Sequence, residues 1–230
     1  MKFFQESLSI FTIVFATLFP VINPLGGAPI FLNLVDGCSQ PTRDKLAKSI
    51  GINSFLLLFG AMAFGPSLLL FFGISLPVLK IGGGIVVAAM GWNLLNKGGK
   101  SSADSGGHAG ITDLTAGGSA FYPLTLPLTV GPGSIATMIA LVANHKKTPD
   151  FHIESELSAI VGAVLGILAV TLTIYIAYRE ASGIQRVLGV NGTNVLMRLF
   201  AFILFLIGLQ IVWGGVGALI LDAASILSSQ

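Results

Sequence analysis

The sequence has little charge: only 10% of its 230 residues are Asp, Glu, Lys or Arg, whereas an ordinary soluble domain carries about 25%. Hydrophobic residues make up 53% of the chain, and its mean hydropathy is +0.88. A soluble globular enzyme and a disordered protein are both excluded, because neither keeps so little charge in water.

Cysteine is also scarce, since Cys38 is the only one in the chain. A disulfide framework and a four-cysteine metal site are therefore excluded. The three histidines all fall in polar connecting stretches, which leaves no histidine cluster inside an apolar segment. Glycine and proline are plentiful, with 29 and 10 residues set among apolar ones. That composition is typical of a packed polytopic membrane protein.

The gaps between charged residues predict the membrane spans, because about 20 apolar residues cross a bilayer as a helix. Six largely uncharged stretches predict six transmembrane helices, at residues 7–34, 49–72, 77–96, 118–143, 157–178 and 195–221. No series of alternating ten-residue strands appears, so the predicted fold class is all-α. The first stretch is too long for a signal peptide and has no cleavage site, so we interpret it as a retained helix.

A stretch rich in glycine and serine divides the chain into two halves. Residues 1–95 and 119–230 hold three spans each, and residues 96–118 form a predicted flexible cytoplasmic linker. Of the 12 Lys and Arg residues, eight fall on the linker side of the membrane and four on the other. An excess of basic residues marks the cytoplasmic side, so both termini are predicted to be periplasmic.

The two halves resemble each other weakly. In the first and fourth spans a proline is followed six residues later by glycine, at Pro20 and Gly26 and at Pro127 and Gly133. The last span of each half opens with similar residues, Phe72-Gly73-Ile74 and Leu188-Gly189-Val190. Because each half has an odd number of spans, the second half must be inserted upside down relative to the first. This is the inverted-repeat plan of many secondary transporters.

Both proline-rich segments are predicted to break their helices near mid-membrane, at residues 23–27 and 130–134. Proline removes a backbone donor, and glycine tolerates the angles that result. A new half-helix then presents free amides and the positive end of its dipole, which suit a carboxylate. Proline kinks without a site are the alternative, but two breaks at equivalent positions favour a site. The candidate substrate-binding residues are Asn23, Pro24, Gly26, Gly27, Thr129, Gly131, Pro132, Gly133 and Ser134.

Lys80 and Arg198 are the only charged residues near the start of a span rather than in a loop. They occupy equivalent positions in the repeat and are expected at opposite faces of the membrane. Two interpretations stay open: gate residues or counter-charges to a substrate carboxylate, and side chains that merely extend to the interface. Asn93 and Gln210 near the far ends of the third and sixth spans are expected to bond between helices.

Several absences constrain the mechanism. No Asp or Glu lies in the middle of a span, which disfavours a carboxylate proton relay. Sodium needs only oxygen ligands, and broken helices supply carbonyls. We therefore rank sodium-coupled transport and uncoupled transport equally. We expect no cofactor and no metal site. No phosphate-binding loop and no nucleophile–base pair is found in the spans, so the chain is not expected to be an enzyme.

Four groups of residues together resemble the MarC family of six-span bacterial inner-membrane proteins. They are Asn23-Pro24-Leu25-Gly26 with Pro29, Phe72-Gly73-Ile74-Ser75 with Lys80-Ile81-Gly82-Gly83, Pro123-Leu124-x-x-Pro127 with Gly131-Pro132-Gly133-Ser134-Ile135-Ala136, and Arg198. The resemblance covers nearly the whole chain. It implies a neutral amino acid transporter, with glycine and alanine as implied substrates. The family usually has arginine where Lys80 stands, and lysine lacks the planar fork of arginine.

The sequence thus predicts a multi-pass protein of the bacterial inner membrane with six helices in two inverted three-helix repeats. Its predicted function is secondary transport of small neutral amino acids by alternating access. The alternatives are a channel or exporter for another small solute, and a membrane scaffold that transports nothing. The expected partners are the amino acid and the lipid bilayer, with no nucleic acid. Small residues on spans three and five suit either a homo-oligomer or packing within one chain.

Overall fold

The computed structural model describes residues 2–96, 111–145 and 153–228, and in these ranges the regular structure is entirely helical. The chain-order elements are α1 (Lys2–Ile22), α2 (Pro24–Leu34), α3 (Gln40–Phe71), α4 (Leu76–Asn96), α5 (Ala116–Ser119), η2 (Ala120–Thr129), α6 (Pro132–His145), α7 (Ile153–Arg179) and α8 (Ala181–Ser228). The all-α prediction is confirmed for these residues.

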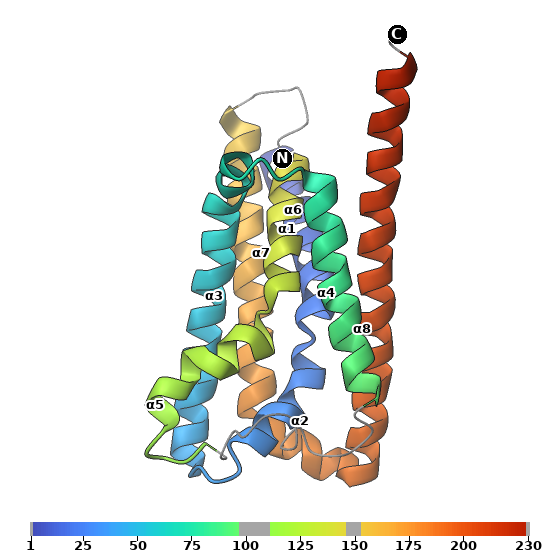
Figure 1. The fold of residues 1–230 in the computed structure, drawn as a ribbon. Helices are drawn as coiled ribbons and strands as arrows, with labels where there is room; N and C mark the ends of the chain where they lie inside the picture. Colours follow the sequence, from blue (N-terminus) through green and yellow to red (C-terminus); the bar gives the residue numbers. More distant parts are fainter. Residues whose placement is uncertain (1, 97–110, 146–152, 229–230) are drawn as a thin grey trace.

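The long helices form one bundle in which the chain crosses from end to end repeatedly (Figure 1). α1 and α2 descend together in the view of Figure 1, α3 rises and α4 descends. After the linker, α5, η2 and α6 rise, α7 descends and α8 rises again. The start of α1 and the end of α8 therefore lie at the same end of the bundle. We call this end the terminal end, and the end with the α2–α3 turn the linker end.

Five helices of the described chain are long and apolar enough to cross a membrane, and α1 with α2 counts as one of them. A sixth crossing results if the pair Ala116–Thr129 and Pro132–Ala143, which is bent by 66°, is one broken span. The predicted span 118–143 is this bent pair. The structure thus bears out a chain of five or six apolar crossings, and the arrangement in two inverted repeats stays a prediction.

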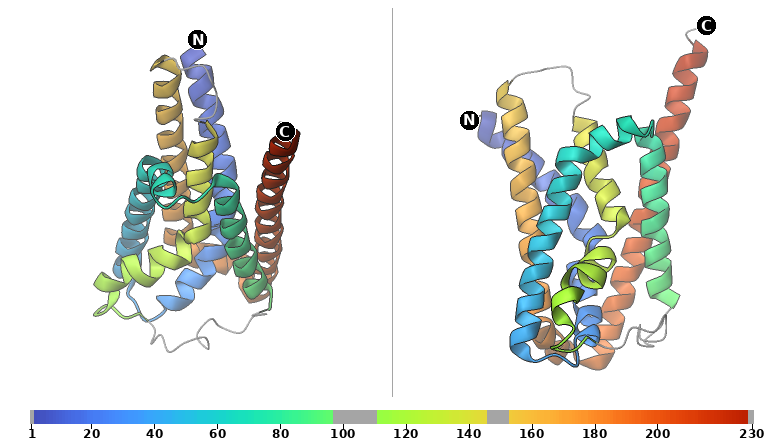
Figure 2. Two further views of the ribbon diagram at one scale, coloured as in Figure 1. Left: turned by 45° about the horizontal axis from the view of Figure 1, so that its top comes forward. Right: turned by 60° about the vertical axis from the view of Figure 1, so that its left-hand side comes forward.

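α7 lies in the centre of the core. Ile167, Val170 and Ile174, spaced along α7, are fully buried, and the helix contacts α1, α3 and α2. Two views show α3 and α4 on either side of η2 and α6, joined across the terminal end (Figure 2). Large apolar side chains such as Leu70 and Trp213 are exposed on the outside of the bundle. That outer surface suits hydrocarbon, since lipid tails are as apolar as leucine.

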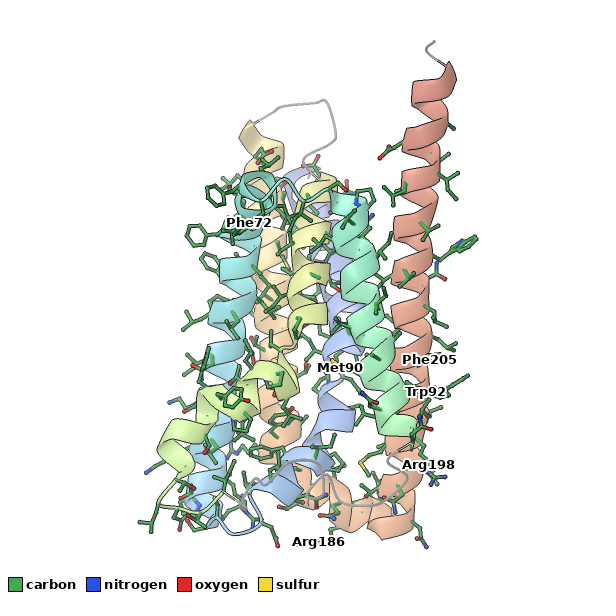
Figure 3. All side chains as sticks on the ribbon, in the orientation of Figure 1. Phe72, Met90, Trp92, Arg186, Arg198 and Phe205 are labelled. Carbon is green, nitrogen blue, oxygen red and sulfur yellow. The ribbon has the colours of Figure 1, made fainter. Side chains whose placement is uncertain are left out.

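α4 and α8 pack along a seam of glycines. A β-carbon on Gly84 would lie 2.7 Å from Val212 N and 2.8 Å from Gly208 O. A β-carbon on Gly91 would lie 2.9 Å from Ala201 O, and one on Gly208 would lie 2.6 Å from Ala88 Cα. Such distances leave no room for a side chain, so the two backbones touch directly. Trp92 and Phe205 cover the outside of this seam, with ring centroids 5.7 Å apart (Figure 3).

Glycines on α7 and α4 allow close packing between helices, as the sequence predicts, with one exception. Gly162 and Gly166 on α7 face α1, where β-carbons would meet Ser7 O and Val14. In the triplet on α4, Gly83 faces Ala136 of α6, whereas Gly82 has nothing within 4 Å. Packing within one chain therefore accounts for these glycines except Gly82.

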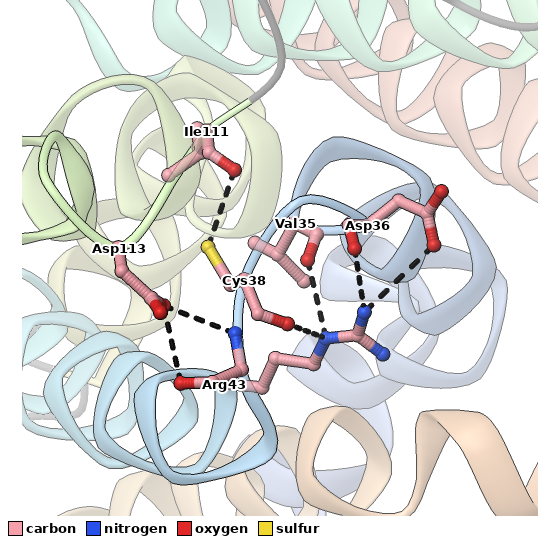
Figure 4. A network of polar contacts seen from close by, with 7 residues as sticks. Val35, Asp36, Cys38, Arg43, Ile111 and Asp113 are labelled. Carbon is pink, nitrogen blue, oxygen red and sulfur yellow. Dashed lines mark hydrogen bonds and ion pairs between the residues drawn. The ribbon is translucent and has the colours of Figure 1, made fainter.

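A turn stabilised by Arg43 connects α2 to α3 at the linker end (Figure 4). Arg43 Nε donates to Val35 O at 3.1 Å and to Cys38 O at 3.0 Å, and Arg43 Nη2 donates to Asp36 O at 2.8 Å. Nη2 also lies 3.7 Å from Asp36 Oδ1. These bonds satisfy carbonyls that the end of a helix leaves without partners.

Part of the predicted flexible linker is ordered against this turn. Ile111 N donates to Leu34 O at 3.0 Å, and the Cys38 thiol donates to Ile111 O at 3.2 Å. Asp113 Oδ1 accepts from Ser39 N at 3.0 Å and Ser39 Oγ at 3.2 Å (Figure 4). Burial raises the pKa of the Cys38 thiol, and the Asp113 carboxylate adds to this. The predicted linker, residues 96–118, is thus ordered from Ile111 onward, because this segment has partners far away in the sequence. Residues 97–110 lie outside the described part.

Candidate functional site

The first break lies at Asn23, between α1 and α2. Asn23 has φ 51° and ψ 59°, in the left-handed region that Asn adopts more readily than most residues. Its Oδ1 accepts from Gly26 N at 3.1 Å, and its carbonyl accepts from Gly27 N at 2.9 Å. Pro24 follows as the first residue of α2, where its missing N–H costs nothing. The predicted break at 23–27 is thus found at its first residue.

The second break lies at Val130 and Gly131, between η2 and α6. Val130 is extended, with φ −109° and ψ 90°, and its N–H donates to Thr125 O. Earlier in the same segment, Tyr122 and Leu126 also leave helical geometry, each directly before a proline. The residue before proline is pushed toward extended conformations, which explains both departures. The break predicted at 130–134 is found there, and the distortions at residues 122 and 126 are additional.

The two breaks meet in one cavity of about 390 Å³, within the range of about 300–1,000 Å³ that small-molecule sites occupy. Its wall draws on α1, α2, α4, η2, α6 and α8. Seven predicted site residues form part of the wall: Asn23, Gly26, Gly27, Thr129, Gly131, Gly133 and Ser134. Apolar residues complete most of it, among them Ile30, Val87, Met90, Leu94, Leu128 and Leu204. Segments far apart in sequence thus converge where the sequence predicts a site.

Two predicted site residues, Pro24 and Pro132, do not line the cavity. Each is the first residue of a helix, α2 or α6. Their rings lie elsewhere, since Pro24 is buried in the bundle and Pro132 is exposed. Their part in the site is to begin the two half-helices at fixed points.

The two candidate charges also lie away from the cavity wall. Lys80 is half-buried in the first turns of α4, a helix that begins at the terminal end (Figure 1). Arg198 is exposed on α8 near the linker end (Figure 3). They therefore lie at opposite ends of the bundle. Asn93 lines the cavity, and we find no bond between helices from Asn93 or Gln210 within the described residues.

Comparison with known proteins identifies the family of the chain. A profile of the MarC family, described as integral membrane proteins, matches residues 8–220. The chain belongs to the MarC family. The predicted family is therefore confirmed.

Curated UPF0056 membrane proteins are similar to the chain along most of their length. The UPF0056 membrane protein YvbG of Bacillus subtilis is 30% identical over 203 residues, which cover 88% of this chain and 92% of YvbG. A UPF0056 membrane protein of Archaeoglobus fulgidus is 32% identical over 211 residues, which cover 90% of this chain and 92% of that protein. The UPF0056 inner membrane protein MarC of Citrobacter koseri is 30% identical over 202 residues, which cover 86% of this chain and 90% of that protein. No solved structure is significantly similar to the chain.

The polar groups of the cavity in this MarC-family protein are neutral. None of the described residues in its wall carries a charged side chain. Ser134 Oγ donates to Gly131 O at 2.9 Å, and Thr129 Oγ1 donates to Leu124 O at 2.7 Å. A hydroxyl has one proton, so both oxygens are left with acceptor capacity only. No group of three or more His, Cys, Asp or Glu able to hold a metal ion occurs in the described parts of the chain.

One residue beside the site was missed by sequence reasoning. Tyr178, near the end of α7, is 2% exposed, and its hydroxyl lies 2.9 Å from Thr129 Oγ1. A β-carbon on Gly27 would lie 2.6 Å from the same hydroxyl oxygen. The Tyr178 ring stacks on Phe31 of α2, with centroids 4.8 Å apart and planes 11° apart. No local pattern marks Tyr178, because its partners lie about 50 and 150 residues away.

Proposed function

We propose that this MarC-family protein is a secondary transporter of small neutral amino acids, such as glycine and alanine, working by alternating access. One observation carries the proposal: two helix breaks from opposite halves of the chain form the wall of one uncharged cavity. Unwound backbone inside a membrane is tolerated where it lines a cavity, and transporters bind substrates at such breaks. The cavity lies at the lower end of the size range for ligand sites, which favours a small solute.

The polar groups suit a zwitterion better than an ion of net charge. Because Pro132 has no N–H, Gly133 supplies the first backbone donor of α6, and helix N-termini attract carboxylates. Ser134 and Thr129 offer oxygen acceptors that suit an ammonium group. A doubly charged substrate would lack a counter-charge among the described residues of the wall.

Three features support an inverted repeat, on which alternating access rests. The helices of the second half run opposite to those of the first (Figure 1). Gly73 before α4 and Gly189 within α8, which the sequence match pairs, have nearly the same φ, 66° and 64°. The last spans of the two halves also close with similar residues, Gly91-Trp92-Asn93-Leu94 and Gly208-Leu209-Gln210-Ile211. Gly91 and Gly208 each face the backbone of the partner helix in the α4–α8 seam.

The proposed orientation puts the linker end in the cytoplasm and both termini in the periplasm. Arg186 and Arg198 lie at the linker end, opposite Phe72 (Figure 3), and the basic start of α3 lies there too. Basic residues favour the cytoplasmic side. The location that we propose is the bacterial inner membrane, where the name of the Citrobacter koseri relative places that protein.

Coupling to sodium and uncoupled exchange are both compatible with this site. The broken segments supply carbonyls such as Gly131 O, but that oxygen already accepts from Ser134 N, Ser134 Oγ and Ile135 N. The one acidic residue of the first span, Glu6, accepts from Ser158 Oγ at 2.9 Å near the terminal end. A proton relay through Glu6 would therefore start far from the breaks in sequence and structure.

The experiment is countertransport in proteoliposomes. Vesicles with purified protein hold unlabelled alanine inside, and labelled alanine is added outside, with protein-free vesicles as the background. We expect saturable uptake that internal alanine accelerates. A channel would show uptake without acceleration, and a scaffold would show none. Repeating the assay with and without sodium, and at two pH values, separates coupled from uncoupled transport.

A further inference from the structure

Tyr178 connects both broken segments of the cavity wall. It contacts Gly27 in α2 and Thr129 in η2, while its own helix, α7, forms the centre of the core. The ring is held on the other side by stacking on Phe31, which is fully buried. Its hydroxyl therefore has a fixed position at the junction of the two halves.

The direction of the hydrogen bond between Tyr178 and Thr129 follows from counting protons. The Thr129 hydroxyl has one proton, and it donates that proton to Leu124 O at 2.7 Å, since a carbonyl only accepts. Thr129 Oγ1 must then accept in the 2.9 Å bond with Tyr178, so the tyrosine hydroxyl is the donor. These two bonds fix the rotamer of Thr129 and leave its oxygen one unused lone pair.

We propose that Tyr178 is a positioning residue for the substrate ammonium group: its hydroxyl fixes Thr129 Oγ1 in the wall, where the bond to Leu124 O leaves that oxygen with acceptor capacity only. This inference rests on the proposed function and adds the end of the site that binds the ammonium. Thr129 is 3% exposed and belongs to the cavity wall, so its remaining lone pair is available only to a group inside the cavity. Ser134, which has also spent its proton on a backbone carbonyl, provides a second acceptor.

Two hydrogen-bond donors on the cavity wall, from Asn23 and Gly133, are assigned to the substrate carboxylate. Asn23 Oδ1 accepts from Gly26 N, which fixes the orientation of the amide and leaves Nδ2 as a donor group. We find no bond from Nδ2 within the described residues, and the Gly133 amide is the first donor of α6. A carboxylate therefore binds at Asn23 and Gly133, and the ammonium binds at Thr129 and Ser134.

The test is a double-mutant cycle on alanine exchange, with Tyr178→Phe, Thr129→Val and the pair of substitutions together. Phenylalanine keeps the ring on Phe31, and valine keeps the shape of threonine. Each single substitution should raise the KM about three- to tenfold and leave the maximal rate within about twofold, as expected for one lost hydrogen bond. The pair should have the KM of Thr129→Val alone, because Tyr178 acts through Thr129.

Matched controls separate positioning from folding. Tyr175→Phe removes the hydroxyl of a neighbouring tyrosine on α7 that binds Arg179 at 3.0 Å, and it should leave the KM unchanged. Thr129→Ser keeps the hydroxyl and should stay within about twofold of the wild-type KM. If Thr129→Val is poorly folded, Thr129→Ala, which also lacks the hydroxyl, takes its place in the cycle.

A wild-type KM in Tyr178→Phe would overturn the inference, and so would effects that multiply in the double variant. Either result leaves the proposed function standing, provided that the wild type exchanges alanine. If the wild type, shown to be folded, neither exchanges nor binds alanine, the proposed function fails and the inference fails with it.

Discussion

The side chain of Asn23 lies directly over the backbone of Gly26. Its Oδ1 accepts from Gly26 N at 3.1 Å, and a β-carbon at residue 26 would lie 2.8 Å from both Cγ and Oδ1 of Asn23. The asparagine thus caps the helix that follows the break, in the position where Asn, Asp and Ser are preferred. Glycine three residues later is what lets the cap close.

Gly26→Ala should damage the site. The added methyl group collides with the Asn23 side chain, and overpacking of this kind costs about 1–3 kcal/mol. We expect alanine exchange to fall about tenfold or more. The assay is exchange in proteoliposomes at equal amounts of folded protein.

Gly82→Ala is the matched control for this prediction. Gly82 is a helical glycine with nothing within 4 Å of an added β-carbon. Its substitution should leave exchange within about twofold, since such sites accept alanine readily. Equal losses in both variants would show that the contact between residues 23 and 26 has no special role.

Asn23→Gly and Asn23→Ala should separate the backbone from the side chain of this residue. Glycine adopts the positive φ of 51° without strain, whereas alanine does not. We expect Asn23→Ala to lower the free energy of unfolding by about 1–2 kcal/mol more than Asn23→Gly does. Both variants should lose affinity for alanine, because both lack the Nδ2 donor. Thermal unfolding and ligand binding in detergent measure the two effects, and full affinity in Asn23→Gly would contradict the role of Nδ2.

The α4–α8 seam should not tolerate side chains. Gly208→Leu places a large group where the backbone of Ala88 lies, and we expect a loss of at least about 3 kcal/mol or failure to fold. Gly217→Leu lies on the same helix with open space around it, and it should be nearly neutral. Yield and thermal unfolding in detergent compare the two. Similar behaviour of both variants would mean that the seam is not close-packed.

The hydrogen bonds from Ser39 to the Asp113 carboxylate should weaken at low pH. The N–H of Ser39 donates to this carboxylate and, with hydroxyl bonds from Thr42 and Ser39, holds its pKa below the ordinary 3.8. A lowered pKa in the folded state means that the stabilisation is present above pH 3.8 and is lost as the pH falls through the lowered value. Hydrogen-exchange protection of the Ser39 amide should fall over that range in the wild type. In Asp113→Asn it should be lower and independent of pH, and a pH-independent wild type would disprove this role of Asp113.

Local chemistry explains why much of this site is predictable from sequence. Pro24 and Pro132 are each the first residue of a helix, a position that suits proline, so breaks at Asn23 and Gly131 could be predicted from neighbouring residues. Proline alone does not mark a break, since Pro20, Pro29 and Pro66 lie inside helices. Long uncharged stretches likewise predict the apolar crossings. The same reasoning placed Pro24 and Pro132 in the site, although their rings lie outside the cavity wall.

Tertiary contacts explain what the sequence did not predict. Tyr178 and Asn93 reach the site only because α7 and α4 pack beside the breaks. No local pattern marks Tyr178, and Asn93 was expected to bond between helices rather than to line a cavity. The order at Ile111 depends on Leu34 and Cys38, more than 70 residues earlier. α8 begins at Ala181 and bends at Gly189 before its apolar stretch, whereas charge spacing alone predicted a start at residue 195.

The central claim is that the cavity between the breaks binds and carries a small neutral amino acid. The most direct measurement is alanine exchange by the wild type, by Asn23→Ala/Ser134→Ala, and by Ser75→Ala/Asn96→Ala, whose two residues are exposed and outside the cavity wall. The account predicts saturable exchange in the wild type and the control pair, and its loss in the cavity pair. Exchange that persists unchanged in the cavity pair, or no exchange by folded wild-type protein, would contradict it.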